Sequence, residues 1–222
     1  MQLDLDELTA VLTRFVAHPG PDQPAQIQAL LHTRLPDELR YIRASTQKMD
    51  RLINAILNLS RLGRKVLQWE VLDLQTLVEE NVKALGHGIQ SAGISVTVGQ
   101  LPNLRTDRTA MEQIVGNLLS NAIKFLDPNR PGLIHIDGEM NWEAGQVVIR
   151  VRDNGRGIDP ADIQKIFVLF QRAGKQDRPG EGMGLAYIRS WVRRLGGRIR
   201  CESTVGVGTT FCVTLPITPP AH

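Results

Sequence analysis

The chain has 222 residues, of which 42% are hydrophobic, enough for one large domain or two modest ones. Its net charge of +3 comes with only 5% aromatic residues, which disfavours a nucleic-acid surface that stacks bases among cations. Two cysteines, Cys201 and Cys212, are too few for a disulfide framework. The sequence has neither a basic leader nor an apolar run long enough to cross a bilayer, which predicts a soluble, cytoplasmic chain with reduced thiols and no membrane partner.

Two helical segments are predicted at the start of the chain. In the first, apolar residues recur at spacings of three, four and three positions, namely Leu5, Leu8, Leu12 and Phe15. Three prolines and a glycine between His18 and Pro24 interrupt this pattern. A second helix is predicted to begin near Pro36 and to end at Gly63, because proline favours a first helical turn and glycine favours a helix end.

The second helix carries a long apolar stripe. Its members alternate at spacings of three and four positions: Leu39, Ile42, Thr46, Met49, Ile53, Ile56 and Ser60. Two helices cannot bury this much apolar surface alone. We therefore expect residues 1–66 to form a helical hairpin that makes a homodimer through a four-helix bundle.

The remainder of the chain, residues 67–222, has the pattern of an α+β domain. Strands are predicted at residues 94–98, 133–137, 146–151, 198–202 and 210–215, and helices near residues 73–85, 109–125 and 183–195. These elements predict an α/β sandwich in which helices cover one face of a mixed sheet. The arginines between residues 189 and 200 fit a solvated helix face or a protein contact better than a nucleic-acid site.

Polar side chains follow one face of the helix predicted near residues 109–125. Asn117, Asn121 and Lys124 are separated by four and three positions, so they lie on the same side of a helix. An asparagine oxygen is a suitable ligand for Mg²⁺ that is shared with phosphates, and a lysine supplies a mobile positive charge. The alternative is an amphipathic helix whose polar residues face water.

Three glycine-containing segments complete the pattern. Asp153, Gly155 and Gly157 form an Asp-x-Gly-x-Gly turn, where backbone approaches a ligand closely and a buried carboxylate would accept the adenine amine. A glycine-rich loop precedes the last predicted helix, so that N–H groups and a helix N-terminus can face phosphate; it contains Gly180, Gly182, Met183, Gly184 and Leu185. Near the end, Gly208 and Thr209 lie in a hairpin turn. Taken singly, each segment also fits an ordinary turn.

In this order and spacing, the motifs resemble the ATP-binding domain of sensor histidine kinases, within the superfamily of DNA gyrase and the ninety-kilodalton heat-shock chaperones. The resemblance extends over residues 70–216 and includes a phenylalanine box at residues 166–171. The short lid at residues 172–179 is similar to that of the phytochrome-like branch. The resemblance implies the cofactors ATP and Mg²⁺, a response-regulator receiver domain as partner, and an upstream sensor module outside this chain.

The resemblance also implies a role for each matching residue. Asn121 would bind Mg²⁺, Asn117 would support the metal and the phosphates, and Lys124 would contact phosphate oxygens. Asp153 would accept the adenine amine in a pocket shaped by Gly155, Gly157 and Thr209, while Gly182 and Gly184 would be hinges of a moving lid. Three lid cations would neutralise phosphoryl charge or else belong to a solvated loop: Arg172, Lys175 and Arg178.

The hairpin departs from the family at the phosphoacceptor. Residues 51–62 resemble the family's second helix, and residues 6–12 best fit the motif of the first helix. There, Asp6 stands at the position of the expected histidine and Val11 at that of a proline, while Glu7 matches the general base. His18 and His32 are the other histidines of the hairpin, each with a surface or capping role as the alternative.

Several functions are compatible with this pattern. The leading hypothesis is an ATP-binding protein kinase of the histidine kinase class in a phosphorelay, degenerate at its acceptor. The second is a non-catalytic pseudokinase, a dimeric module that regulates a response regulator or another kinase. The third is a partner-directed serine kinase, which the long hairpin disfavours. A gyrase-like ATPase is disfavoured because Asn117 stands where a water-activating glutamate is expected.

Overall fold

The structure is a computed structural model that describes residues 35–174 and 182–219. The first predicted helix and the loop up to Pro24 lie outside the described residues. Contacts divide the chain into two compact units that meet between Leu57 and Asn58. Each unit is described by itself below, and the predicted domain boundary at residue 66 stays a prediction.

Helix α3 (Leu35–Arg64) corresponds to the second helix of the predicted hairpin. It ends within one residue of Gly63, as the sequence predicts. Its apolar stripe is exposed in the single chain at Leu39, Ile42, Met49, Ile53 and Ile56. The four-helix bundle that would cover this stripe stays a prediction. No helix in the described part of the chain has both the length and the apolar character needed to cross a membrane.

The second unit contains a five-stranded sheet with the spatial order β2-β4-β5-β7-β6. Its strands are β2 (Ser95–Val98), β4 (Leu133–Asn141), β5 (Gln146–Asp153), β6 (Arg198–Thr204) and β7 (Gly208–Pro216). The pair β2 and β4 is parallel and the other pairs are antiparallel. All five predicted strands are therefore present, although β4 and β5 extend further than the sequence predicts.

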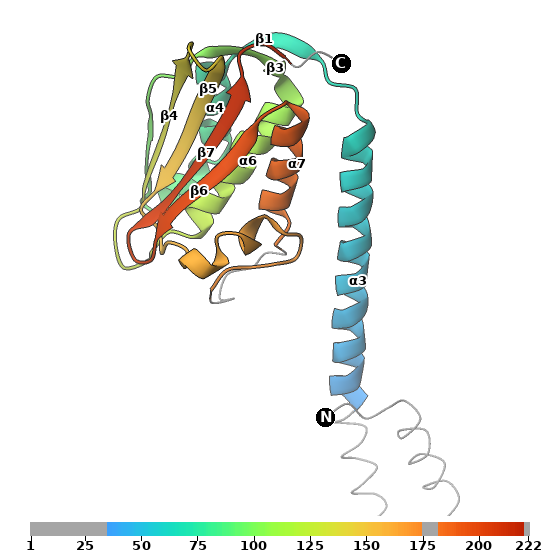
Figure 1. Ribbon diagram of the computed structural model, residues 1–222. Helices are drawn as coiled ribbons and strands as arrows, with labels where there is room; N and C mark the ends of the chain where they lie inside the picture. Colours follow the sequence, from blue (N-terminus) through green and yellow to red (C-terminus); the bar gives the residue numbers. More distant parts are fainter. Residues whose placement is uncertain (1–34, 175–181, 220–222) are drawn as a thin grey trace, which may run out of the picture. The chain divides into compact units, whose positions relative to one another are not determined.

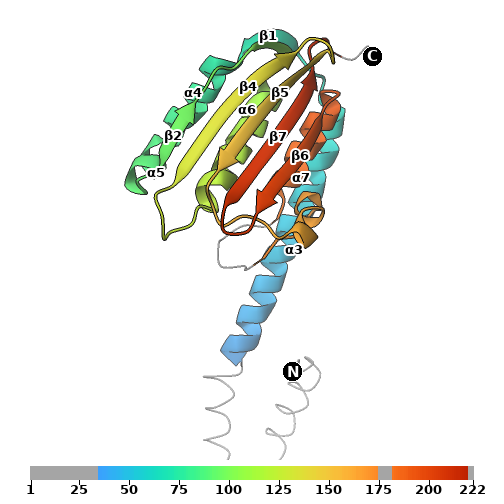
Figure 2. The same cartoon turned by 60° about the vertical axis from the view of Figure 1, so that its left-hand side comes forward.

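Helices cover one face of this sheet, as Figure 1 and Figure 2 show. The three predicted helices are α4 (Leu74–Ala84), α6 (Arg108–Lys124) and α7 (Gly184–Arg194). A short helix α5 (Gly86–Ser91) and the 3₁₀ turns η2 (Pro160–Asp162) and η3 (Lys165–Phe167) complete the layer. The predicted α/β sandwich is confirmed.

Two short strands, β1 (Trp69–Asp73) and β3 (Asn103–Asp107), form a separate antiparallel pair. Each strand ends in an aspartate that caps the helix after it. Asp73 accepts hydrogen bonds from the first turn of α4, and Asp107 Oδ1 accepts one from Ala110 N at 2.8 Å at the start of α6. Because an N-cap carboxylate satisfies free N–H groups, these aspartates fix where both helices begin.

Strand alternation separates the two faces of the sheet. On β5, Val147, Ile149 and Val151 are buried under the helices, in line with the period of two expected of a half-buried strand. The opposite face carries charged residues instead. There Arg150 bridges Asp137, at 3.0 Å, and Glu139, while the helix-covered face buries the fully enclosed side chains of α6, including Met111 and Leu118.

Helix α7 is attached at its C-terminal end to the last turn of α3 and to the residue that follows this helix. The Arg194 guanidinium donates hydrogen bonds to the carbonyl oxygens of Leu62 and Lys65. The Lys65 ammonium lies 5.6 Å from the ring centroid of Trp191 on the same helix, and Leu62 is buried. These residues belong to the second compact unit, which therefore includes the last turn of α3.

Candidate nucleotide-binding site

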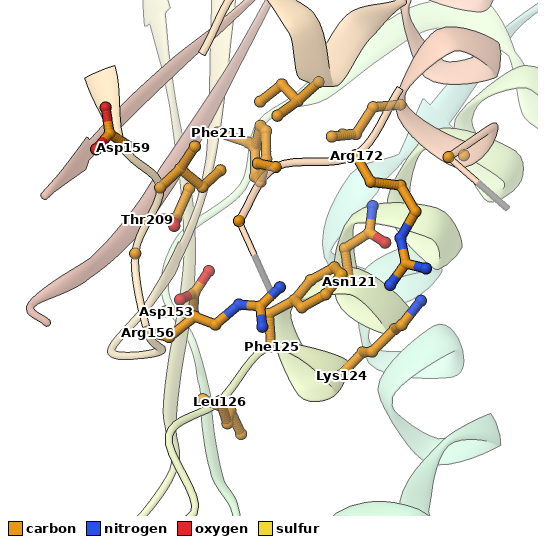
Figure 3. Close-up of a pocket in the computed structure, with 18 of the residues that line it drawn as sticks. Asn121, Lys124, Phe125, Leu126, Asp153, Arg156, Asp159, Arg172, Thr209 and Phe211 are labelled. Carbon is orange, nitrogen blue, oxygen red and sulfur yellow. The ribbon is translucent and has the colours of Figure 1, made fainter. Parts of the chain in front are cut away.

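A cavity of about 960 Å³ opens where the C-terminal ends of α6 and β5 meet the start of β7 and the segment before α7. Figure 3 shows its labelled side chains, with Asp153 and Thr209 on one side and Asn121, Lys124 and Arg172 on the other. The cavity brings together residues from all four sequence motifs, which lie up to 88 positions apart between Asn121 and Thr209. Its volume fits a drug-sized or nucleotide-sized ligand.

Asp153 is the buried carboxylate of this cavity, with 8% of its surface exposed. Its Oδ1 atom accepts a hydrogen bond from Gly155 N at 2.8 Å, and the backbone N–H of Thr209 donates to the same carboxyl group. Burial raises the pKa of Asp153 to about 6, against the opposing effect of these two N–H groups and of the Arg130 charge. The group is therefore ionised at neutral pH, as an acceptor for an amine requires.

The turn after Asp153 needs glycine at two positions. A Cβ on Gly155 would lie 2.4 Å from the Phe125 carbonyl oxygen, and one on Gly157 would lie 2.1 Å from the Thr204 carbonyl oxygen. Gly157 also has a φ of +71°, which side chains rarely adopt. The glycines thus let the turn pass between α6 and the β6–β7 hairpin at backbone contact distance.

Ser203 joins this turn to strand β7. Its Oγ atom accepts a hydrogen bond from Ile158 N at 2.8 Å and lies 2.8 Å from the Gly208 carbonyl oxygen and 3.0 Å from Thr209 Oγ1. Thr209 is itself buried and lines the cavity. The hydroxyl of Ser203 therefore fixes the position of Thr209 relative to the Asp153 turn.

The amide side chains of α6 lie beside the first residue of α7. A Cβ added to Gly184 would lie 3.7 Å from Asn117 Oδ1 and 3.9 Å from Asn121 Nδ2. Asn121 lines the cavity. Asn117 lines a separate shallow hollow against α4, and its Nδ2 atom donates to the Gln113 carbonyl oxygen at 2.8 Å. Of the two asparagines, Asn121 is thus better placed to contact a ligand in the cavity.

Positive charge gathers around Phe125 at the same end of the cavity. The Lys124 ammonium lies 4.9 Å from the Phe125 ring centroid, and the Arg156 guanidinium lies 4.7 Å from it. Burial, followed by the nearby charges of Arg172 and Arg156, lowers the pKa of Lys124. Cations that lie close together favour a bound anion, because an anion relieves their mutual repulsion.

The ends of the lid segment are held together by backbone contacts. Phe170 N donates a hydrogen bond to the Gly182 carbonyl oxygen at 3.0 Å, and Gly182 has a φ of +70°. Phe170 itself has a φ of +63°, which is uncommon for a bulky residue. Gly182, Met183, Gly184 and Leu185 all line the cavity, and their predicted contact with a nucleotide stays a prediction.

Several predicted residues lie outside the described residues. These are Asp6, Glu7, His18 and His32 of the hairpin and Lys175, Arg178 and Gly180 of the lid. Their predicted roles stay predictions. Conversely, sequence reasoning missed Arg130 and Ser203, which no motif contains. It also missed Arg156, although that residue lies inside the Asp-x-Gly-x-Gly turn.

Residues 106–219 match the family of histidine kinase-, DNA gyrase B- and HSP90-like ATPases, and this match covers just over half of the sequence. The chain therefore belongs to this family, and the predicted histidine kinase-type ATP-binding region of two-component systems is confirmed. The methanogenesis regulatory histidine kinase FilI of Methanothrix harundinacea is 36% identical over 193 residues, which cover 86% of this chain and 21% of FilI.

Two further comparisons agree. The phytochrome-like protein Cph1 of Synechocystis sp. is 35% identical over 170 residues, which cover 76% of this chain and 22% of Cph1. The crystal structure of full-length ShkA in complex with AMPPNP has a TM-score of 0.66 at 24% identity over 84% of this chain and 40% of ShkA, a likeness of fold. The chain spans about a fifth of the length of FilI and Cph1.

Proposed function

We propose that the domain binds Mg²⁺–ATP in the cavity beside Asp153 and provides the γ-phosphoryl group for a two-component phosphorelay. The observation that carries this proposal is the polarity of the cavity. A buried carboxylate stands at one end, and an amide with a cluster of cations stands at the other. This arrangement matches a ligand that has an amino-bearing base at one end and phosphates at the other.

Each end of the cavity has a role in the proposal. The carboxylate of Asp153 accepts the adenine amine. The closely packed turn through Gly155 and Gly157 prevents this carboxylate from shifting to accommodate a base that lacks the amine. Lys124 and Arg172 attract the phosphates and offset charge on the transferred group. In the transfer step, the nucleophilic atom of the residue that receives the phosphoryl group forms a bond to the γ-phosphorus. The bond between the γ-phosphorus and the β–γ bridging oxygen breaks, and ADP leaves.

The residues at the phosphate end also fit a bound Mg²⁺. The Asn121 amide lies in the cavity beside the N-terminal residue of α7 and offers a neutral oxygen, while the remaining ligands of Mg²⁺ are commonly phosphates and water. When bound, the ion neutralises phosphate charge. The likeness of ShkA, whose structure contains AMPPNP, supports a nucleotide in this fold.

Isothermal titration with ATP, with and without Mg²⁺, tests the binding step. We expect a saturable, Mg²⁺-dependent signal in the chain and its loss in Asp153→Asn, with Glu112→Gln as a matched control on the exposed surface of α6. The absence of binding at millimolar ATP would remove the proposal. Labelled ATP with a receiver domain, followed by mass spectrometry, then locates any phosphorylated residue.

A second candidate function follows from the hairpin. Because Asp6 stands where the resemblance expects a phosphoacceptor histidine, the chain would be a non-catalytic dimeric module that responds to ATP and regulates a response regulator or another kinase. The exposed apolar stripe of α3 supports a homodimer in either case. ATP binding without any phosphoprotein favours this second function, and a phosphoserine on a partner favours a serine kinase.

A further inference from the structure

Arg130 lies in the loop between α6 and β4, behind the turn that follows Asp153. Its Nη2 atom donates two hydrogen bonds to backbone carbonyl oxygens, to Gly155 at 2.8 Å and to Val207 at 3.0 Å. These two acceptors lie 52 positions apart in the sequence. Arg130 is not among the residues that line the cavity. It therefore joins two separate turns without facing the ligand space.

The two turns are the ones that hold the Asp153 carboxylate. Gly155 donates its N–H to Asp153 Oδ1 at 2.8 Å, and Thr209, two residues after Val207, donates its N–H to the same group. Arg130 thus binds the carbonyl oxygen of Gly155, which is itself one donor to Asp153, and the carbonyl oxygen of Val207, two residues before the other donor, Thr209. A guanidinium fork suits this task because its planar N–H groups are fixed relative to one another.

The loop that carries Arg130 is itself organised. Asp127 accepts hydrogen bonds from Asn129 N and Asn129 Nδ2, both at 3.0 Å, and lies 3.9 Å from Arg130 Nε. The Nε atom is buried and has no hydrogen-bond partner within the described residues. Burying an unpaired donor costs free energy, so the two carbonyl contacts offset that cost.

We propose that Arg130 is a positioning residue that holds the adenine-reading carboxylate of Asp153 in place by bridging the Gly155 and Val207 turns. This inference rests on the proposed ATP-binding function and names a residue through which the base is selected. Asp153 interacts with two titratable or charged groups on neighbouring elements. The Arg130 charge lowers its pKa, and Cys201 on β6 stays neutral because burial and Asp153 raise the thiol pKa to about 12.

The test compares ATP with inosine triphosphate, which carries an oxygen in place of the adenine amine. In the full chain, we expect a preference for ATP that Arg130→Met lowers roughly five- to tenfold, the effect of about one lost hydrogen bond. Arg130→Lys should restore part of the preference. Arg108→Met is the matched control, because Arg108 pairs with Glu70 at 3.3 Å at the opposite end of α6.

A carbon NMR titration of the Asp153 carboxyl group supplies a readout that needs no nucleotide. Its midpoint should lie near 6 in the unaltered chain and move upward in Arg130→Met, while a variant that merely loses stability would keep the midpoint. A folded Arg130→Met with unchanged ATP preference and unchanged midpoint overturns the inference. If the unaltered chain binds no ATP, the proposed function fails, and the titration alone decides for or against Arg130.

Discussion

The buried carboxylate that reads the base should make the fold less stable at neutral pH. Burial raises the pKa of Asp153 from its ordinary value of 3.8 to about 6, so the folded chain binds a proton between these pH values that the unfolded chain has released. The contribution of this group to the free energy of unfolding therefore falls as the pH rises through that interval. At about 1.4 kcal/mol for each pKa unit, the loss is about 3 kcal/mol.

Asp153→Asn removes this dependence because the amide does not titrate. The free energy of unfolding of the variant minus that of the unaltered chain should rise by about 2 kcal/mol between pH 4 and pH 7, whatever the amide gains or loses in hydrogen bonding. Urea denaturation at four pH values across this range measures the difference. The same variant should bind ATP at least about tenfold more weakly, since it loses a charged acceptor.

The control and the refuting result are both direct. Glu112→Gln removes an exposed carboxylate of α6, and its difference from the unaltered chain should stay within about 0.5 kcal/mol over the same pH range. A stability difference for Asp153→Asn that does not change between pH 4 and pH 7 would show that Asp153 keeps an ordinary pKa. The argument that burial raises the pKa of Asp153 would then be wrong.

Three further predictions concern other parts of the domain. Asn121→Ala should remove the Mg²⁺-dependent part of ATP affinity but keep the Mg²⁺-free part, and calorimetry with and without chelator shows whether the two respond separately. Gly157→Ala should lower the free energy of unfolding by more than about 3 kcal/mol, because its Cβ would meet the Thr204 carbonyl oxygen at 2.1 Å. Gly206→Ala, also at positive φ but in open space, should lower it by only about 1 kcal/mol. Equal denaturation midpoints for the two variants would contradict this prediction. Arg194→Met should destabilise the domain by about 1–2 kcal/mol and speed amide hydrogen exchange at residues 62–66. Unchanged exchange there would show that the hydrogen bonds from Arg194 to Leu62 and Lys65 do not hold this segment.

Much of the sandwich could be predicted because its strands and helices have strong periodic patterns. The strands β1 and β3 could not, because each has only five residues and β1 has a single fully buried position, Leu72. Such short strands are defined by their pairing with each other, which one sequence does not display. Helix α5 was missed for a related reason, since its six residues include two glycines.

The cavity residues divide in the same way. Asp153, Asn121 and Thr209 could be predicted because they belong to motifs with fixed spacing. Arg130 and Ser203 could not, because their importance comes from contacts with residues far along the chain. Asn117 shares a helical face with Asn121, yet one turn along α6 is enough to place it in the hollow beside α4, near Gly184 but outside the lining of the cavity. Helical spacing predicts the face of a side chain but not the depth at which it meets a cavity.

Helix α7 has 11 residues and is therefore roughly 16 Å long. Its first residue, Gly184, lies beside the asparagines of α6, and its last, Arg194, donates hydrogen bonds to the carbonyl oxygens of Leu62 and Lys65 at the end of α3. Because a helix of this length is rigid, a rotation that displaces its first residue also displaces its last residue. Within this unit, one short helix therefore links the ligand space to the residues where α3 ends.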